Sequence, residues 1–134
     1  LARIVKWDEG SSNWIQLGGT LAGTVASGFF GFGISLSADG KVLAIGGVKN
    51  TVEDNKGFVR MYDWSESTTD WVPKGDDILG EFNNTDLLGN LKSIALSADG
   101  TTVAVSAKGH DGDGTETDKG HVRVFHWSET QSSW

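Results

Sequence analysis

The sequence predicts an all-β fold of four-stranded antiparallel blades in tandem, about two and a half repeats that do not close a ring. Its six tryptophans form three pairs with a spacing of seven, namely Trp7 and Trp14, Trp64 and Trp71, and Trp127 and Trp134. Apolar residues alternate with a period of two over short stretches, which is the pattern of β-strands. Nineteen glycines against one proline lie beside these stretches, as expected of many tight turns.

A second segment repeats together with the tryptophans. Ser-Leu-Ser-Ala-Asp-Gly at 35–40 returns as Ala-Leu-Ser-Ala-Asp-Gly at 95–100, a shift of 60, whereas successive tryptophan pairs are shifted by 57 and 63. These differences of three can be placed in loops, as expected of structural repeats. The expected units are a partial repeat at 1–23, a full repeat at 24–80 and a truncated repeat at 81–134. We expect the chain to be part of a longer protein, or a subunit completed by its neighbours.

Each repeat is expected to contain four strands in the same order. The predicted strands are 34–37, 42–46, 58–64 and 71–74, then 94–97, 102–106 and 121–127, with a leading pair at 1–7 and 14–17. The Asp-Gly dipeptides predict an antiparallel hairpin between the first two strands. Pro73 cannot donate a ladder hydrogen bond, so the fourth strand is expected at an edge.

The alternation also assigns faces to these strands. Leu43 and Ile45 share one face of the second strand, and Ala44 lies opposite, where a neighbouring sheet could come close. A sheet that is apolar on both faces must stack on copies of itself. Radial stacking gives a propeller, and linear stacking gives a fibre.

Composition limits the classes of partner. The net charge of -7 argues against nucleic acid and anionic membranes, which require clustered Lys and Arg. The absence of cysteine excludes disulfides and Cys-ligated zinc. No apolar run approaches the roughly 20 residues of a membrane helix, so no membrane insertion is expected.

The segments Phe30-Gly31-Phe32-Gly33 and Gly57-Phe58-Val59-Arg60-Met61-Tyr62 resemble the FG-GAP repeat of integrin α-subunit propellers. The chain is still more similar to tandem repeats of the form S-L-S-x-D-G and G-x-V-R-V-Y-x-W, which are found in secreted bacterial and algal proteins. The resemblance covers nearly the whole chain. It implies propeller blades, an extracellular location and the calcium-binding loops known in this family.

Two loops carry candidate ligand or modification sites. Alternating acidic residues and glycines can fold several oxygens around calcium, and the loop after 102–106 offers Asp111, Asp113, Thr115 and Asp118. The alternative interpretation is a solvated acidic loop that favours solubility. Calcium is therefore a candidate ligand, but no cofactor is required. Asn83 begins the Asn-Asn-Thr sequon, which predicts glycosylation in a secreted protein.

The tryptophan pairs allow two interpretations. They could join adjacent repeats, which the identity of all three pairs favours, or they could form a platform for sugar rings. No catalytic pattern accompanies His110, His121 and His126, so no enzyme is expected. The sequence predicts an extracellular structural or adhesive protein that assembles with copies of itself or with adjacent repeats, including as a filament protomer. The alternative is a propeller segment that binds glycan or calcium.

Overall fold

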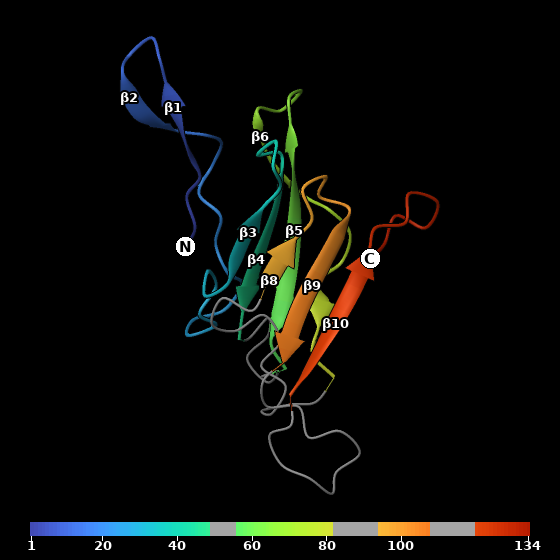
Figure 1. Ribbon diagram of the computed structural model, residues 1–134. Coiled ribbons are helices and arrows are strands. Elements are labelled where there is room, and N and C mark those ends of the chain that lie inside the picture. Colours follow the sequence, from blue (N-terminus) through green and yellow to red (C-terminus); the bar gives the residue numbers. More distant parts are fainter. Residues whose placement is uncertain (49–55, 82–93, 108–119) are drawn as a thin grey trace, which may run out of the picture.

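The computed structural model describes residues 1–48, 56–81, 94–107 and 120–134, and these contain ten strands and no helix (Figure 1). The prediction of an all-β fold is confirmed, since all strands pair antiparallel in several sheets, none of them closed. No helix in these ranges has the length and apolar character needed to cross a bilayer. The strands are β1 (Val5–Asp8), β2 (Asn13–Gln16), β3 (Ile34–Leu36), β4 (Val42–Gly47), β5 (Phe58–Ser65), β6 (Asp70–Pro73), β7 (Ile78–Leu79), β8 (Ile94–Leu96), β9 (Thr102–Ala107) and β10 (His121–His126).

The central sheet follows chain order, β3-β4-β5-β6, and every predicted strand boundary in it agrees with the structure to within one residue. β6 is the last strand in this order, which confirms that the proline-containing strand lies at an edge. Pro73 pairs with Tyr62, and Trp64 stands directly opposite Trp71. β1 and β2 form a two-stranded sheet with Trp7 opposite Trp14, and β8, β9 and β10 form a three-stranded sheet.

One strand was not predicted. β7 pairs with the beginning of β5, with Ile78 opposite Val59, so the outer strand of the central sheet is interrupted between β6 and β7. Ala2 and Leu21 form an isolated bridge 57 residues earlier, which is the same pairing in the first repeat. A two-residue strand is too short to show an alternation, and for this reason the sequence pattern missed it.

The Asp-Gly hairpins are built alike in the second and third repeats. Gly40 and Gly100 take positive φ values of 71° and 72°. The Ser97 hydroxyl donates to Asp99 at 2.6 Å and accepts the Thr102 N–H at 3.0 Å. Ser37 makes the corresponding contacts in the first of these turns. The repeated hexapeptide therefore encodes a turn that satisfies its own polar groups.

This turn should make stability depend on acid pH. Hydrogen bonds from the Ser97 hydroxyl and then from Thr101 lower the pKa of Asp99 from 3.8 to about 2. Because the folded pKa is depressed, the stabilisation is complete above pH 4 and is lost as pH falls from about 4 to 2. We expect Asp99→Asn to flatten the decline of Tm over this interval, measured by circular dichroism. Glu129→Gln, an exposed acid outside the turn, is the control, and an unchanged decline in Asp99→Asn would contradict the assignment.

The core lies between repeats, in two clusters on opposite faces of the central sheet. One cluster joins it to β8–β10 and contains Val42, Ala44, Val59, Met61, Ile78, Ile94, Val103, Val105 and Ala107. The other joins it to the β1–β2 segment through Leu43, Ile45, Tyr62 and Trp71, with Ala2, Ile4, Leu17, Leu21, Phe30 and Trp64 beside them. All six residues of β4 are buried. The predicted faces of the second strand are thus both covered by neighbouring repeats.

Candidate functional site

The same junction joins the first repeat to the second and the second to the third. The indole N–H of Trp71 donates to the Leu17 carbonyl at 3.1 Å, and that of Trp134 donates to the Lys74 carbonyl at 3.0 Å. The two donors are 63 residues apart, which is the shift between the second and third tryptophan pairs. The two acceptors are 57 residues apart, which is the shift between the first and second pairs. The second tryptophan of each of these pairs therefore bonds to the backbone of the repeat before it.

A glycine follows each acceptor and packs against the tryptophan pair. Gly18 has φ of 75°, and Gly75 has φ of 72°. A Cβ on Gly75 would lie 2.8 Å from Cζ3 of Trp127, and one on Gly18 would lie 3.0 Å from Cζ3 of Trp64. Both the backbone conformation and the close approach therefore require glycine here. The sequence holds a signal for this corner, because each glycine follows the second tryptophan of its own repeat by four residues.

Within each pair the two indoles contact each other at an angle. The ring centroids are 5.7 Å apart for Trp7 and Trp14, 5.5 Å for Trp64 and Trp71, and 5.4 Å for Trp127 and Trp134, with interplanar angles of 71°, 66° and 57°. Such tilted and edge-to-face contacts add to the energy of apolar burial. The structure thus places all six predicted tryptophans in three similar hairpin contacts.

Polar contacts differ between the two junctions. At the first, the Gly19 N–H donates to the Asp70 carboxylate at 2.7 Å, and this bond lowers the pKa of Asp70. At the second, the Lys74 ammonium lies 5.1 Å from the centroid of the Trp127 ring and 3.0 Å from Asp63. A cation over an indole face is attracted by the negative potential of the ring. The apolar geometry is therefore conserved between the junctions, whereas the charge contacts are particular to each.

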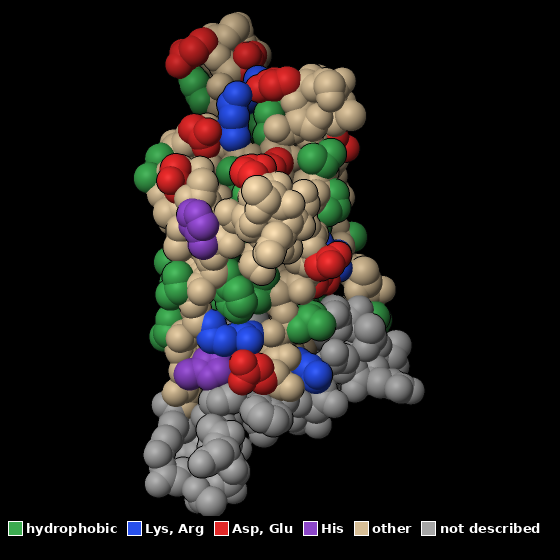
Figure 2. All heavy atoms as spheres, turned by 90° about the vertical axis from the view of Figure 1, so that its right-hand side faces the viewer, with side chains coloured by type: hydrophobic (Ala, Val, Ile, Leu, Met, Phe, Trp, Pro, Cys, Tyr) green, Lys and Arg blue, Asp and Glu red, His purple; other side chains and the backbone are tan. Residues whose placement is uncertain are grey.

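Equivalent residues differ sharply in exposure between repeats. Trp14 is 61% exposed, and Trp71 is 5% exposed. Ile34 is 64% exposed, and Ile94, at the same position of the next repeat, is 7% exposed. On β10, Val122 and Val124 are both 66% exposed, whereas their equivalents Val59 and Met61 are 0% and 1% exposed. The view of the β10 side shows hydrophobic side chains at the surface among charged ones (Figure 2). Exposed apolar side chains thus lie on β2 of the first repeat, on β3 of the second and on β10 of the third.

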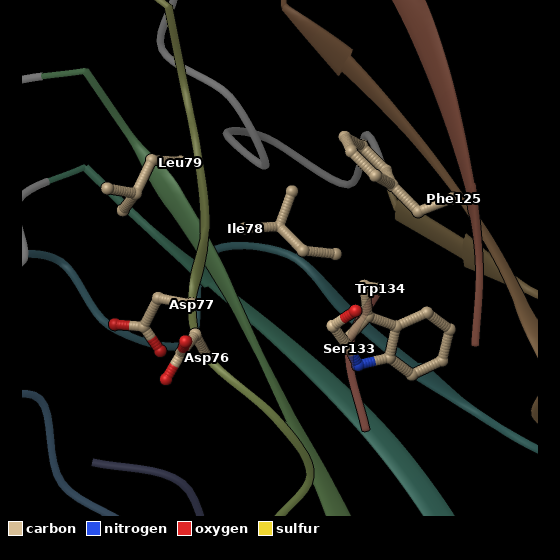
Figure 3. Close-up of a pocket in the computed structure, with 7 residues that line it drawn as sticks. All are labelled: Asp76, Asp77, Ile78, Leu79, Phe125, Ser133 and Trp134. Atoms are coloured by element: carbon tan, nitrogen blue, oxygen red, sulfur yellow. The ribbon is translucent and has the colours of Figure 1, made fainter. Parts of the chain in front are cut away.

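A cavity of about 280 Å³ lies between the second and third repeats (Figure 3). Ile78, Phe125 and Trp134 line it, and the two aromatic residues pack against the core cluster that contains Ile78. The carboxylates of Asp76 and Asp77 point away from the two aromatic rings (Figure 3). Asp77 instead accepts two hydrogen bonds from Arg60, both of 2.7 Å, and this pairing raises the pKa of Arg60. The Asp77 carboxylate is therefore held in an ion pair with Arg60.

The remaining predicted site residues are placed only in part. Asn83 and the predicted calcium ligands Asp111, Asp113, Thr115 and Asp118 lie outside the described residues, as does His110. His126 contacts the Thr102 hydroxyl at 3.0 Å through Nδ1. Within the ranges that the structure describes, no three His, Asp or Glu side chains gather as a metal site. Calcium binding and glycosylation remain predictions.

Comparison with protein-family models, curated proteins and solved structures finds no match for this chain.

Proposed function

We propose that this chain is an extracellular structural or adhesive protein whose propeller-type blades assemble with further repeats or with copies of the chain. The observation that carries the proposal is the β10 face. Val122 and Val124 are largely exposed, although the equivalent Val59 and Met61 are buried by the following repeat. This face is buried in the second repeat and exposed in the third. The exposed copy is therefore suited to accept one more unit of the same kind.

The repeated junction supports a head-to-tail mode of assembly. In the second repeat, Trp71 donates to the repeat before it, and the Lys74 carbonyl accepts from the repeat after it. An interface between unlike faces generates a ring if its rotation closes and a filament if it does not. Assembly as a filament protomer is the form we propose, and the extracellular setting rests on the resemblance to secreted repeats and on the Asn83 sequon.

Removing the apolar character of the β10 face tests this function. We expect the wild-type chain to associate with rising concentration in sedimentation velocity and to form particles larger than a monomer in negative stain. The double variant Val122→Glu with Val124→Glu should remain monomeric, because burying unpaired carboxylates at an interface is costly. Both side chains are exposed, so its stability should change by only about 0.5 kcal/mol per site. The variant Val122→Ile with Val124→Ile is the matched control. A wild-type chain that stays monomeric at every concentration would contradict the proposal.

A glycan-binding segment is the second candidate function. It is favoured by the exposure of Trp7 and Trp14, whose indoles lie together on the β1–β2 hairpin. Exposed aromatic faces suit sugar rings. A glycan array probed with the wild-type chain and with Trp14→Ala tests it: binding lost in the variant supports this function, and no binding by the wild type excludes it for the glycans on the array.

A further inference from the structure

The strand β1 presents an edge that the corresponding strands of the other repeats do not. Among the described residues β1 pairs with β2 alone, whereas β5 also pairs with β4, and β10 pairs with β9 on this side. The Trp64 and Trp127 N–H groups donate across this edge to the carbonyls of Lys41 and Thr101, both at 2.8 Å. Trp7 occupies the same position in β1. In the two later repeats the corresponding edge is covered by the second strand of the repeat, which is β4 or β9. In β1 this edge is open.

The direction of the free backbone groups follows from the pairing with β2. The Leu17 N–H donates to the Ile4 carbonyl at 2.9 Å, so Ile4 faces β2. Successive residues of an antiparallel strand point their backbone groups to opposite sides. The N–H groups of Arg3, Val5 and Trp7 therefore point toward the open edge. Such an edge is a template for another strand.

An apolar groove runs beside this edge. It encloses about 280 Å³ between Ile4 and Val5 on one side and Ile34, Leu36 and Leu43 on the other. Ile4 and Leu43 also belong to the cluster that joins the first repeat to the central sheet, so the groove continues an interface that the fold already uses. Arg3 and Ser35 complete its lining, which is otherwise apolar.

At the junction between the second and third repeats, the β3–β4 hairpin occupies the position that corresponds to this groove. There β8 packs against β3 and β4, and Ile94 is buried together with Ala44. The Leu96 N–H donates to the Ser35 hydroxyl at 2.9 Å, and the Ala38 N–H donates to the Ala98 carbonyl at 2.9 Å. The small side chains Ser35 and Ala44 allow this close approach. A hairpin of the first two strands therefore covers Ile94 and Leu96, the equivalents of Ile34 and Leu36.

We propose that the open edge of β1 and its groove form an acceptor site for a β-hairpin of a partner polypeptide, with the chemistry of the repeat's own first two strands. Its second strand runs antiparallel to β1 and bonds to Arg3, Val5 and Trp7. Its small Ser and Ala side chains face Ile34 and Leu36, and an Asp-Gly turn joins its strands. This is strand addition to a sheet edge, in which main-chain bonds supply affinity and alternate side chains supply selectivity. The inference rests on the proposed function and names the partner that one face of the first repeat accepts.

A synthetic peptide with the sequence of residues 33–48 is the probe. We expect it to slow hydrogen exchange at the amides of Arg3, Val5 and Trp7 in the full chain by at least tenfold, measured by NMR. The amides of Ala2 and Leu17, which already donate within the first repeat, are the internal reference. A peptide of the same composition in scrambled order should protect none of these amides. Unchanged exchange at Arg3, Val5 and Trp7 with saturating peptide would overturn the inference.

Two variants and one control variant separate strand addition from other modes of binding. Val5→Pro removes an N–H at the open edge and no hydrogen bond to β2, and it should weaken peptide binding at least tenfold. Val5→Thr keeps the N–H and the β-branch and should bind like the wild type. Ile34→Ser, in the groove wall, should weaken binding without touching the β1 backbone. Wild-type affinity in both Val5→Pro and Ile34→Ser would contradict the site.

These outcomes are independent of the test by sedimentation. If the chain assembles through β10 but the peptide does not protect the β1 amides, only the proposed hairpin site is contradicted. If the chain binds the peptide but stays monomeric, the proposed assembly is contradicted and the hairpin site is supported.

Discussion

Trp71→Ala is expected to lower the free energy of unfolding by about 3–5 kcal/mol, whereas Trp14→Ala should lower it by less than about 1 kcal/mol. The two residues hold the same position in their repeats. Trp71 is buried against the first repeat and bonds to the Leu17 carbonyl, while Trp14 is largely exposed. Urea unfolding followed by far-UV circular dichroism measures both changes.

A third substitution separates the hydrogen bond from the packing. Trp71→Phe keeps an aromatic ring but removes the indole donor, and we expect it to cost less than Trp71→Ala and more than Trp14→Phe. The lost bond to the carbonyl contributes about 1 kcal/mol of this cost. Equal losses for Trp71→Ala and Trp14→Ala would mean that each tryptophan stabilises only its own hairpin, and the idea of a junction built on these pairs would be wrong.

Gly75→Ala is expected to destabilise the chain by about 2–4 kcal/mol, while Gly40→Ala should cost only about 1 kcal/mol. Both glycines have nearly the same positive φ, 72° and 71°, so both substitutions carry the same backbone penalty. Only at Gly75 would the new Cβ overlap an indole, since the nearest atom to a Cβ on Gly40 is 3.9 Å away. The difference, about 1–3 kcal/mol, is the cost of overpacking at the junction.

Thermal and urea unfolding of the two glycine variants measure this difference directly. Near-UV circular dichroism, which reports the packing of the tryptophans, should change for Gly75→Ala and remain unchanged for Gly40→Ala. Equal destabilisation by the two substitutions would show that the Trp127 indole moves aside at little cost, and the close approach at this corner would then have no energetic role.

The strands were predictable because their signals are local. Period-two alternation in β4 and β5 and the Asp-Gly turns at Gly40 and Gly100 are properties of a few neighbouring residues. Pro73 identified an edge strand because a residue without an N–H cannot lie inside a ladder. β7 was not predicted because a strand of two residues is too short to show an alternation of apolar and polar residues.

The candidate site was predictable only in part. The three tryptophan pairs stood out in the sequence, but the carbonyls of Leu17 and Lys74 carry no side-chain signal. Gly18 and Gly75 were visible only as a spacing from the tryptophan before them. The pairing of Asp77 with Arg60, 17 residues away, depends on the sheet that brings β5 beside the β7 segment. The predicted calcium ligands and Asn83 remain sequence predictions.

By itself, the sequence determined the all-β class, the antiparallel hairpins and the edge position of the proline-containing strand, because these depend on local alternation and turn chemistry. Only the tertiary structure decided which copy of a repeated residue is covered. Trp14 and Trp71, or Ile34 and Ile94, are identical in type and position within the repeat, yet one of each pair is exposed and the other is buried. Burial depends on the neighbouring repeat rather than on the residue's own surroundings in the chain. For the same physical reason, Val122 and Val124 are exposed on β10.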